Sequence, residues 1–151
     1  MSAGPFSTSE STIRVVWAGT GLFVLSGALA VVFDASATRS VAVAVALACF
    51  ALGCVLYLSG YARAVQRSRA EEISMAALTF LAGETASPRV RRQLLGATAV
   101  QVVAAVAGAS ARPFTSLAFG ILAPVLGVGA QAFWASRFGT FPRRVVKPKR
   151  R

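Results

Sequence analysis

The amino-acid sequence predicts an all-α fold: a polytopic membrane protein with a four-transmembrane-helix bundle and a short interfacial helix in the cytoplasmic loop. Hydrophobic residues make up 56% of the chain and charged residues 14%, whereas a water-soluble domain carries about a quarter charged residues. The mean hydropathy of +0.65 points the same way. Four segments are also long enough and free enough of charge to cross a hydrocarbon core, which needs about 20 helical residues.

The expected spans follow one another without repeats or low-complexity linkers. The third is slightly short, but it can extend through Arg91 and Arg92, whose long side chains can reach the membrane interface. The four spans cover residues 15–33, 41–61, 94–111 and 114–134.

The basic residues predict the orientation, because cytoplasmic loops carry an excess of lysine and arginine. Fourteen of the sixteen fall at the N-terminus, after the second span or in the C-terminal tail, and only Arg39 and Arg112 fall elsewhere. We therefore expect a multi-pass protein of the cell membrane with both termini cytoplasmic. A cleaved signal peptide would have an unusually long apolar core. The chain divides into a cytoplasmic N-terminus (1–14), transmembrane helices 1 and 2 (15–61), a basic cytoplasmic loop (62–93), a transmembrane hairpin (94–135) and a basic cytoplasmic tail (136–151).

The stretch EEISMAALTFLAGETASPRVRR, residues 71–92, lies in the cytoplasmic loop. Its apolar run is about half as long as a span, so we expect a short interfacial helix at 71–83, lying on the inner membrane surface. Ile73, Phe80 and Leu81 recur at helical spacing and share one face. They are the candidates for docking a partner protein.

The ends of these helices carry recognisable residues. Gly83 suits the position just after a helix, where the left-handed conformation is common. Ser87 is expected to cap the third span, and Pro88 to be its first helical residue.

Polar and helix-breaking residues inside spans three and four form the candidate site. The turn near Arg112 places Gln101 and Pro124 at the same depth. Because proline leaves the carbonyl of Gly120 without its helical donor, we expect the Gln101 amide to bond Gly120, contributing about 0.6–2 kcal/mol. The alternative is that Gln101, Thr98 and the Pro124 kink line a polar path for a substrate.

Small residues recur at every fourth position on both helices, a pattern that lets helix backbones approach closely. We expect a tight hairpin of spans three and four to use one row of the fourth span. The other row is then available to spans one and two or to another subunit. The rows are Ala97, Gln101, Ala105 and Ala109; Ser116, Gly120 and Pro124; and Ala123, Gly127 and Gln131.

The tail FPRRVVKPKRR, residues 141–151, is strongly basic and lacks the interleaved aromatic residues of a nucleic-acid surface. We expect no nucleic acid partner. One interpretation is a disordered tail drawn to anionic headgroups of membrane lipids at the cytoplasmic face, with about 1 kcal/mol per cation. The equally open alternative is a tail that only determines the topology. The expected headgroup contacts are Arg143, Arg144, Lys147, Lys149, Arg150 and Arg151.

No catalytic, cofactor-binding or metal-binding pattern is recognisable, so we expect no enzyme and no cofactor. Histidine is absent, and the spans hold no carboxylate of the kind that a proton-coupled exporter needs. Cys49 and Cys54 are not the close pair of quinone-coupled thiol chemistry. We expect a non-enzymatic accessory or scaffold subunit of an inner-membrane complex, with other membrane subunits or further copies as partners. The alternative is a small homo-oligomeric transporter or channel.

The C-terminal half contains TFLAG, RRQLLGA and RPFTSLAFGILAPVLGVGAQAFWASRFGTFPRR. Over residues 72–144 it resembles small four-span membrane proteins of high-GC Gram-positive bacteria. RPFTSLAFG, at 112–120, is the most specific piece. The resemblance implies a membrane-spanning fold and carries no catalytic or binding residue.

Overall fold

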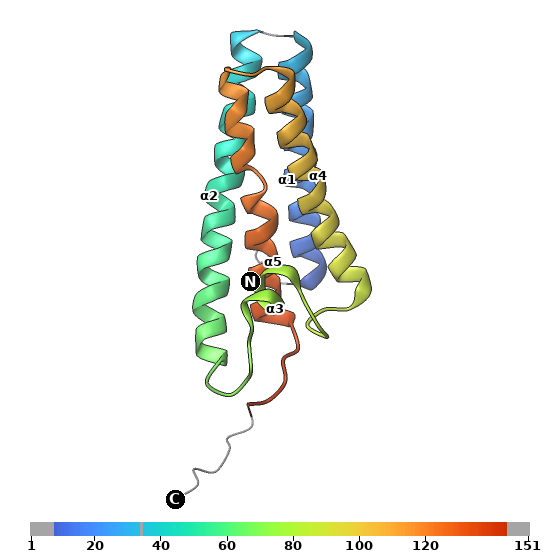
Figure 1. Cartoon of the computed structure of the whole chain (residues 1–151), viewed down its shortest axis with the longest axis vertical. Helices are drawn as coiled ribbons and strands as arrows, with labels where there is room; N and C mark the ends of the chain where they lie inside the picture. Colours follow the sequence, from blue (N-terminus) through green and yellow to red (C-terminus); the bar gives the residue numbers. More distant parts are fainter. Residues whose placement is uncertain (1–7, 34, 145–151) are drawn as a thin grey trace, which may run out of the picture.

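A computed structural model gives the structure of the chain and describes residues 8–33 and 35–144. Four of its segments are long and apolar enough to cross a membrane: α1, α2, α4, and η1 together with α5 (Figure 1). The predicted all-α fold of a multi-pass membrane protein is therefore confirmed. The elements are α1 (Ser9–Phe33), α2 (Ser36–Arg67), α3 (Met75–Phe80), α4 (Pro88–Ala111), the 3-10 helix η1 (Ser116–Leu122) and α5 (Val125–Phe138).

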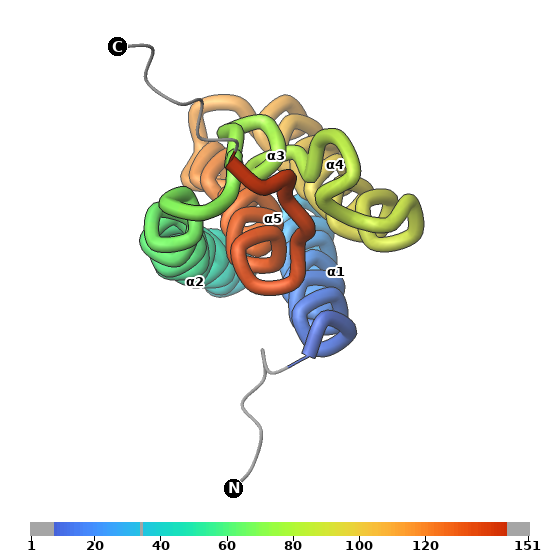
Figure 2. Tube along the Cα trace, turned by 90° about the horizontal axis from the view of Figure 1, so that it is seen from below, coloured from blue at the N-terminus to red at the C-terminus, as the bar shows by residue number. Residues whose placement is uncertain are grey.

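The four spans stand side by side in an elongated bundle, and the end view places α5 among the other helices (Figure 2). Nine of the 14 residues of α5 are buried, against six of the 25 in α1. The start of α1, the end of α5 and the loop that carries α3 lie at one end of the bundle (Figure 1). Ten of the twelve arginines in the described chain belong to the segments at that end, whereas Arg39, at the start of α2, and Arg112, just after α4, belong to the other end.

The tightest crossing joins α2 and α5 through glycines. A Cβ on Gly53 would collide with the backbone of Val125, and one on Gly129 would collide with the Gly53 carbonyl. A Cβ on Gly60 would lie 2.7 Å from the Ala132 carbonyl carbon. The expectation that the hairpin of spans three and four is the tight pair therefore missed this backbone contact, because it did not consider the glycines of the second span.

The two rows of small residues on the fourth span face different neighbours. Gly127 lies against Thr98 and Gln101 of α4. A Cβ added to Gly120 would lie 3.5 Å from the Phe23 ring of α1. Gly127 of one row thus meets the third span, as expected for the hairpin, and Gly120 of the other row meets the first span, one of the neighbours that the spacing left open.

The loop helix α3 is shorter than the predicted 71–83. The Ser74 side chain caps it by accepting from Ala77 N at 3.0 Å, and it ends at Leu81 in the left-handed conformation with φ of 53°. Leu81 takes the position just after the helix, and burial of its whole side chain offsets the backbone strain. Gly83, two residues later, is also left-handed, with φ of 69°. The predicted start of α4 is confirmed, with Ser87 as its cap and Pro88 in its first turn.

Candidate functional site

The fourth span is broken in the middle of the bundle, where Pro124 separates η1 from α5. On both sides of the break the backbone bonds to the third residue back instead of the fourth. Ala123 N donates to Gly120 O at 3.0 Å, and Leu126 N donates to Ala123 O at 3.0 Å. The 3-10 pattern therefore satisfies the carbonyls that proline would otherwise leave without a donor.

The expected bond between Gln101 and Gly120 is wrong for this reason, since Ala123 already occupies the Gly120 carbonyl. The group set free is instead the N–H of Gly127, whose usual acceptor, Ala123 O, is taken by Leu126. Gly127 N donates to Gln101 Oε1 at 3.2 Å. Gln101 does accept a hydrogen bond from the backbone near the proline break, but the donor is three residues after Pro124.

Gln101 also connects the break to α1. Its Nε2 donates to Thr20 Oγ1 at 2.7 Å, and that hydroxyl donates to Val16 O at 2.8 Å. Gln101 and Thr20 are each 1% exposed. One side chain of α4 thereby joins three of the four spans at the centre of the bundle.

Thr98 forms the second half of this network, one turn nearer the start of α4. Its hydroxyl donates to Leu94 O at 3.0 Å and accepts from Gln131 Nε2 at 2.7 Å. Gln131 is 1% exposed, and within the described residues its Oε1 has no hydrogen-bond partner. Among the described residues of this network, it is the only buried side-chain acceptor without a hydrogen bond.

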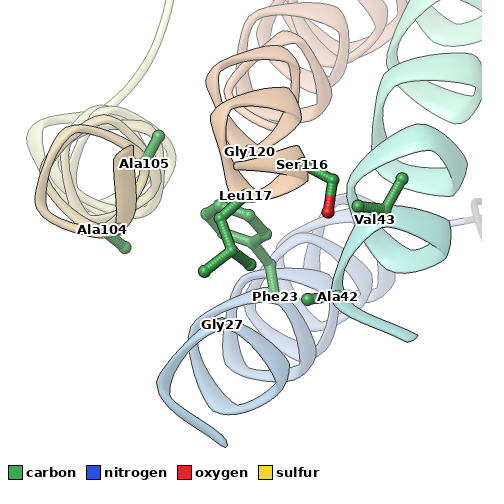
Figure 3. Close-up of a pocket in the computed structure, with 10 residues that line it drawn as sticks. Phe23, Gly27, Ala42, Val43, Ala104, Ala105, Ser116, Leu117 and Gly120 are labelled. Carbon is green, nitrogen blue, oxygen red and sulfur yellow. The ribbon is translucent and has the colours of Figure 1, made fainter. Parts of the chain in front are cut away.

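A small cavity lies between η1 and the neighbouring helices α1, α2 and α4 (Figure 3). Its volume is about 30 Å³, which is room for about one water molecule. Phe23 and Leu117 line it, and the hydroxyl of Ser116 points toward Ala42 and Val43 of α2 (Figure 3). The cavity is too small for a substrate other than water.

The predicted site residues Gln101, Thr98, Gly120 and Pro124 are thus brought to one region, although Gly120 bonds only to backbone. The groups that meet there are amides and hydroxyls, which carry no charge near neutral pH. Such an arrangement holds helices together in lipid, where a polar group without a partner is costly. It offers no general acid or base.

The arginine-rich end forms a second structured region, here called the loop-end platform and defined as residues 68–87 with residues 139–144. Arg67, at the end of α2, ties it together. Its guanidinium contacts Glu71 Oε2 at 2.8 Å and donates to Ser136 O at 2.9 Å and to Gly139 O at 3.1 Å. It also lies 5.0 Å from the centre of the Phe141 ring. Because Ser136 and Gly139 end α5, this cation caps the negative end of that helix.

The chain after α5 is anchored to the same platform. Glu72 N donates to Pro142 O at 2.8 Å, and Arg144 N donates to Ala70 O at 3.0 Å. Thr140 N donates to Thr85 O at 3.2 Å. The expectation of a tail disordered from residue 141 is therefore wrong for its first four residues, including Arg143 and Arg144, because the loop supplies their backbone partners. The other predicted headgroup contacts lie outside the described residues: Lys147, Lys149, Arg150 and Arg151.

The predicted docking residues separate in the structure. Leu81 is fully buried and Ile73 is half-buried, whereas Phe80 is 61% exposed. Leu81, which directly follows α3, belongs to the buried core where α3 packs on α5. It therefore cannot contact a partner. Met75 is 55% exposed and joins Phe80 as an accessible apolar side chain.

Comparison of the chain with protein-family models, with curated proteins and with solved structures finds no match to any of them. The resemblance to small membrane proteins of high-GC Gram-positive bacteria therefore stays an expectation.

Proposed function

We propose that this protein is a non-enzymatic accessory subunit of a complex in the cell membrane, and that it binds a partner subunit through the loop-end platform. Both termini and the platform then face the cytoplasm. The observation that carries the proposal is the platform itself: a loop folded by specific hydrogen bonds that presents Met75 and Phe80 outward.

The surface of the platform suits protein binding. A hollow of about 810 Å³ opens between the loop and the chain after α5, and Glu72, Glu84 and Arg144 lie among its lining residues. Exposed apolar side chains beside a polar hollow are typical of interaction sites. Phe80 provides the kind of large side chain that anchors an interface.

The charge distribution supports the orientation. Ten of the twelve arginines in the described residues lie at the platform end, and cytoplasmic loops carry such an excess. The anionic lipids of the cytoplasmic leaflet would attract this end as well.

The interior of the bundle supports an accessory role over transport. Gln101, the principal candidate for a pathway, is 1% exposed and bonds within the bundle through both ends of its amide. A solute would have to break these bonds in order to pass it.

Site-specific photo-crosslinking in native membranes tests the proposal. A photoreactive amino acid at Phe80 should give one discrete adduct with a different polypeptide, and the same group at Val103, which is 69% exposed on α4, should label lipid only. The double variant Met75→Ser/Phe80→Ser should release that partner while the protein stays inserted. Retention of the partner by this variant would contradict the proposal.

A small homo-oligomeric transporter or channel is the second candidate, and the broken fourth span favours it, because discontinuous helices line many transport sites. Gln131, whose Oε1 has no hydrogen-bond partner among the described residues, lies on the same span, seven residues after Pro124. Flux through vesicles that contain only this protein tests it: Gln101→Leu should abolish flux while leaving expression intact. Absence of flux in the wild-type protein would exclude this candidate.

A further inference from the structure

A polar hollow of about 550 Å³ lies between the first turns of α1 and α4, at the arginine-rich end of the bundle. It is separate from the hollow of the loop-end platform. Ser9, Glu10 and Arg14 line it from α1, and Arg89 and Gln93 line it from α4.

Hydrogen bonds from two tryptophans orient Ser9 and Gln93. Trp134 Nε1 donates to Ser9 Oγ at 2.7 Å, and Trp17 Nε1 donates to Gln93 Oε1 at 2.8 Å. An indole N–H can only donate, so it takes up an acceptor on each partner. The Ser9 hydroxyl proton and the Gln93 amide N–H groups are left as donors.

The arginines add positive charge to these donors. Arg89 has no hydrogen-bond or ion-pair partner among the described residues. Arg14 lies 3.5 Å from Glu10, but the two side chains are 81% and 76% exposed. An exposed pair of this kind is weak, so Arg14 can turn to a stronger anion.

We infer that this hollow binds a phosphate group, and that the group belongs to an anionic phospholipid. Hydroxyl, amide and guanidinium donors together match the oxygens of a phosphate. The position favours a lipid over a free anion: Ile13 and Val90 give the hollow apolar sides, and Trp17 beside it is 39% exposed, as an aromatic ring at a membrane interface would be. The inference does not depend on the accessory role proposed above.

Native mass spectrometry of the full chain in mild detergent tests the inference with three probes: phosphatidylglycerol, phosphatidylcholine and inorganic phosphate. The first variant is Arg14→Gln/Arg89→Gln, and its matched control is Arg63→Gln/Arg69→Gln. The control removes two exposed arginines from the same end without touching the hollow. Elution volume and melting temperature verify that each variant is folded.

The wild-type protein should bind phosphatidylglycerol at least about tenfold more tightly than phosphatidylcholine. The Arg14→Gln/Arg89→Gln variant should lose about tenfold in phosphatidylglycerol affinity, and the control should stay within about twofold of wild type. Equal losses in the two variants would show only general attraction to charge and would overturn the site. Binding of inorganic phosphate as tight as that of the lipid would overturn the lipid assignment.

A second variant tests the orientation of the donors. Gln93→Glu keeps an oxygen for Trp17 but replaces the amide N–H groups with a second carboxylate oxygen. It should lose phosphatidylglycerol binding, with Trp17 still bonded and the melting temperature unchanged. Full retention of the lipid by folded Gln93→Glu would contradict the proposed donor set.

Discussion

Replacing Gln101 with leucine removes the residue that joins three spans, and its effect can be worked out from the contacts. Leucine has nearly the same volume, so packing is largely kept. Two hydrogen bonds are lost: from Gln101 Nε2 to Thr20, and from Gly127 N to Gln101 Oε1. Such bonds inside membrane proteins contribute about 0.6 kcal/mol each on average and up to about 1.7.

The greater cost comes from the backbone donor that loses its acceptor. Gly127 N–H is buried, and its helical acceptor is already bonded to Leu126, so nothing replaces Gln101. A buried donor without a partner costs about 1–3 kcal/mol. The lost bonds and the unpaired donor together predict that Gln101→Leu lowers the free energy of unfolding by about 2–4 kcal/mol.

Denaturation by sodium dodecyl sulfate in mixed micelles, followed by tryptophan fluorescence, measures this change. Gln66→Leu is the matched control, because Gln66 is exposed near the end of α2 and should show little effect. Gln131→Leu provides a contrast: it loses one bond to Thr98 but also removes the unpartnered Oε1, so its effect should be near zero. A change below about 0.5 kcal/mol in Gln101→Leu would refute the role assigned to this network.

Three further outcomes are expected. Gly53→Ala should lower the free energy of unfolding by about 1–3 kcal/mol, because the added Cβ would collide with the backbone of α5. Gly21→Ala is the control, because the space around Gly21 is open and no such loss is expected. Equal effects of the two substitutions would contradict the tight crossing of α2 and α5. Arg67→Gln should raise the amide hydrogen exchange of Glu72 and Arg144 at least about tenfold, because their hydrogen bonds join the loop to the chain after α5, with Arg63→Gln as the control. Unchanged exchange would contradict the role of Arg67 in holding this chain segment. A fluorescent protein fused to either end of the chain should fluoresce in the cytoplasm, and a dark C-terminal fusion would contradict the orientation.

The spans and the cap of α4 could be predicted from the sequence because both depend on neighbours in the chain. Apolar segments of sufficient length identify helices in lipid, and Ser87 followed by Pro88 identifies a helix start. The depth of Gln101 relative to the proline break also followed from counting along two antiparallel helices.

The partners of these groups could not be predicted, because they depend on which helices meet. The sequence does not reveal that the backbone around Pro124 tightens into a 3-10 pattern, so the carbonyl of Gly120 was expected to need Gln101. In the same way, Leu81 was assigned to an exposed face because the packing of α3 on α5 sets the rotation of the helix. The glycines Gly53 and Gly60 carried a usable signal, two small residues seven apart on one helix face, which was overlooked.

The mass and composition of the intact particle, purified from native membranes in mild detergent, test the central proposal most directly. An accessory subunit predicts a particle that contains a different polypeptide in fixed stoichiometry, and that is lost with Met75→Ser/Phe80→Ser. A particle made only of copies of this chain would contradict the accessory role and favour the transporter or channel.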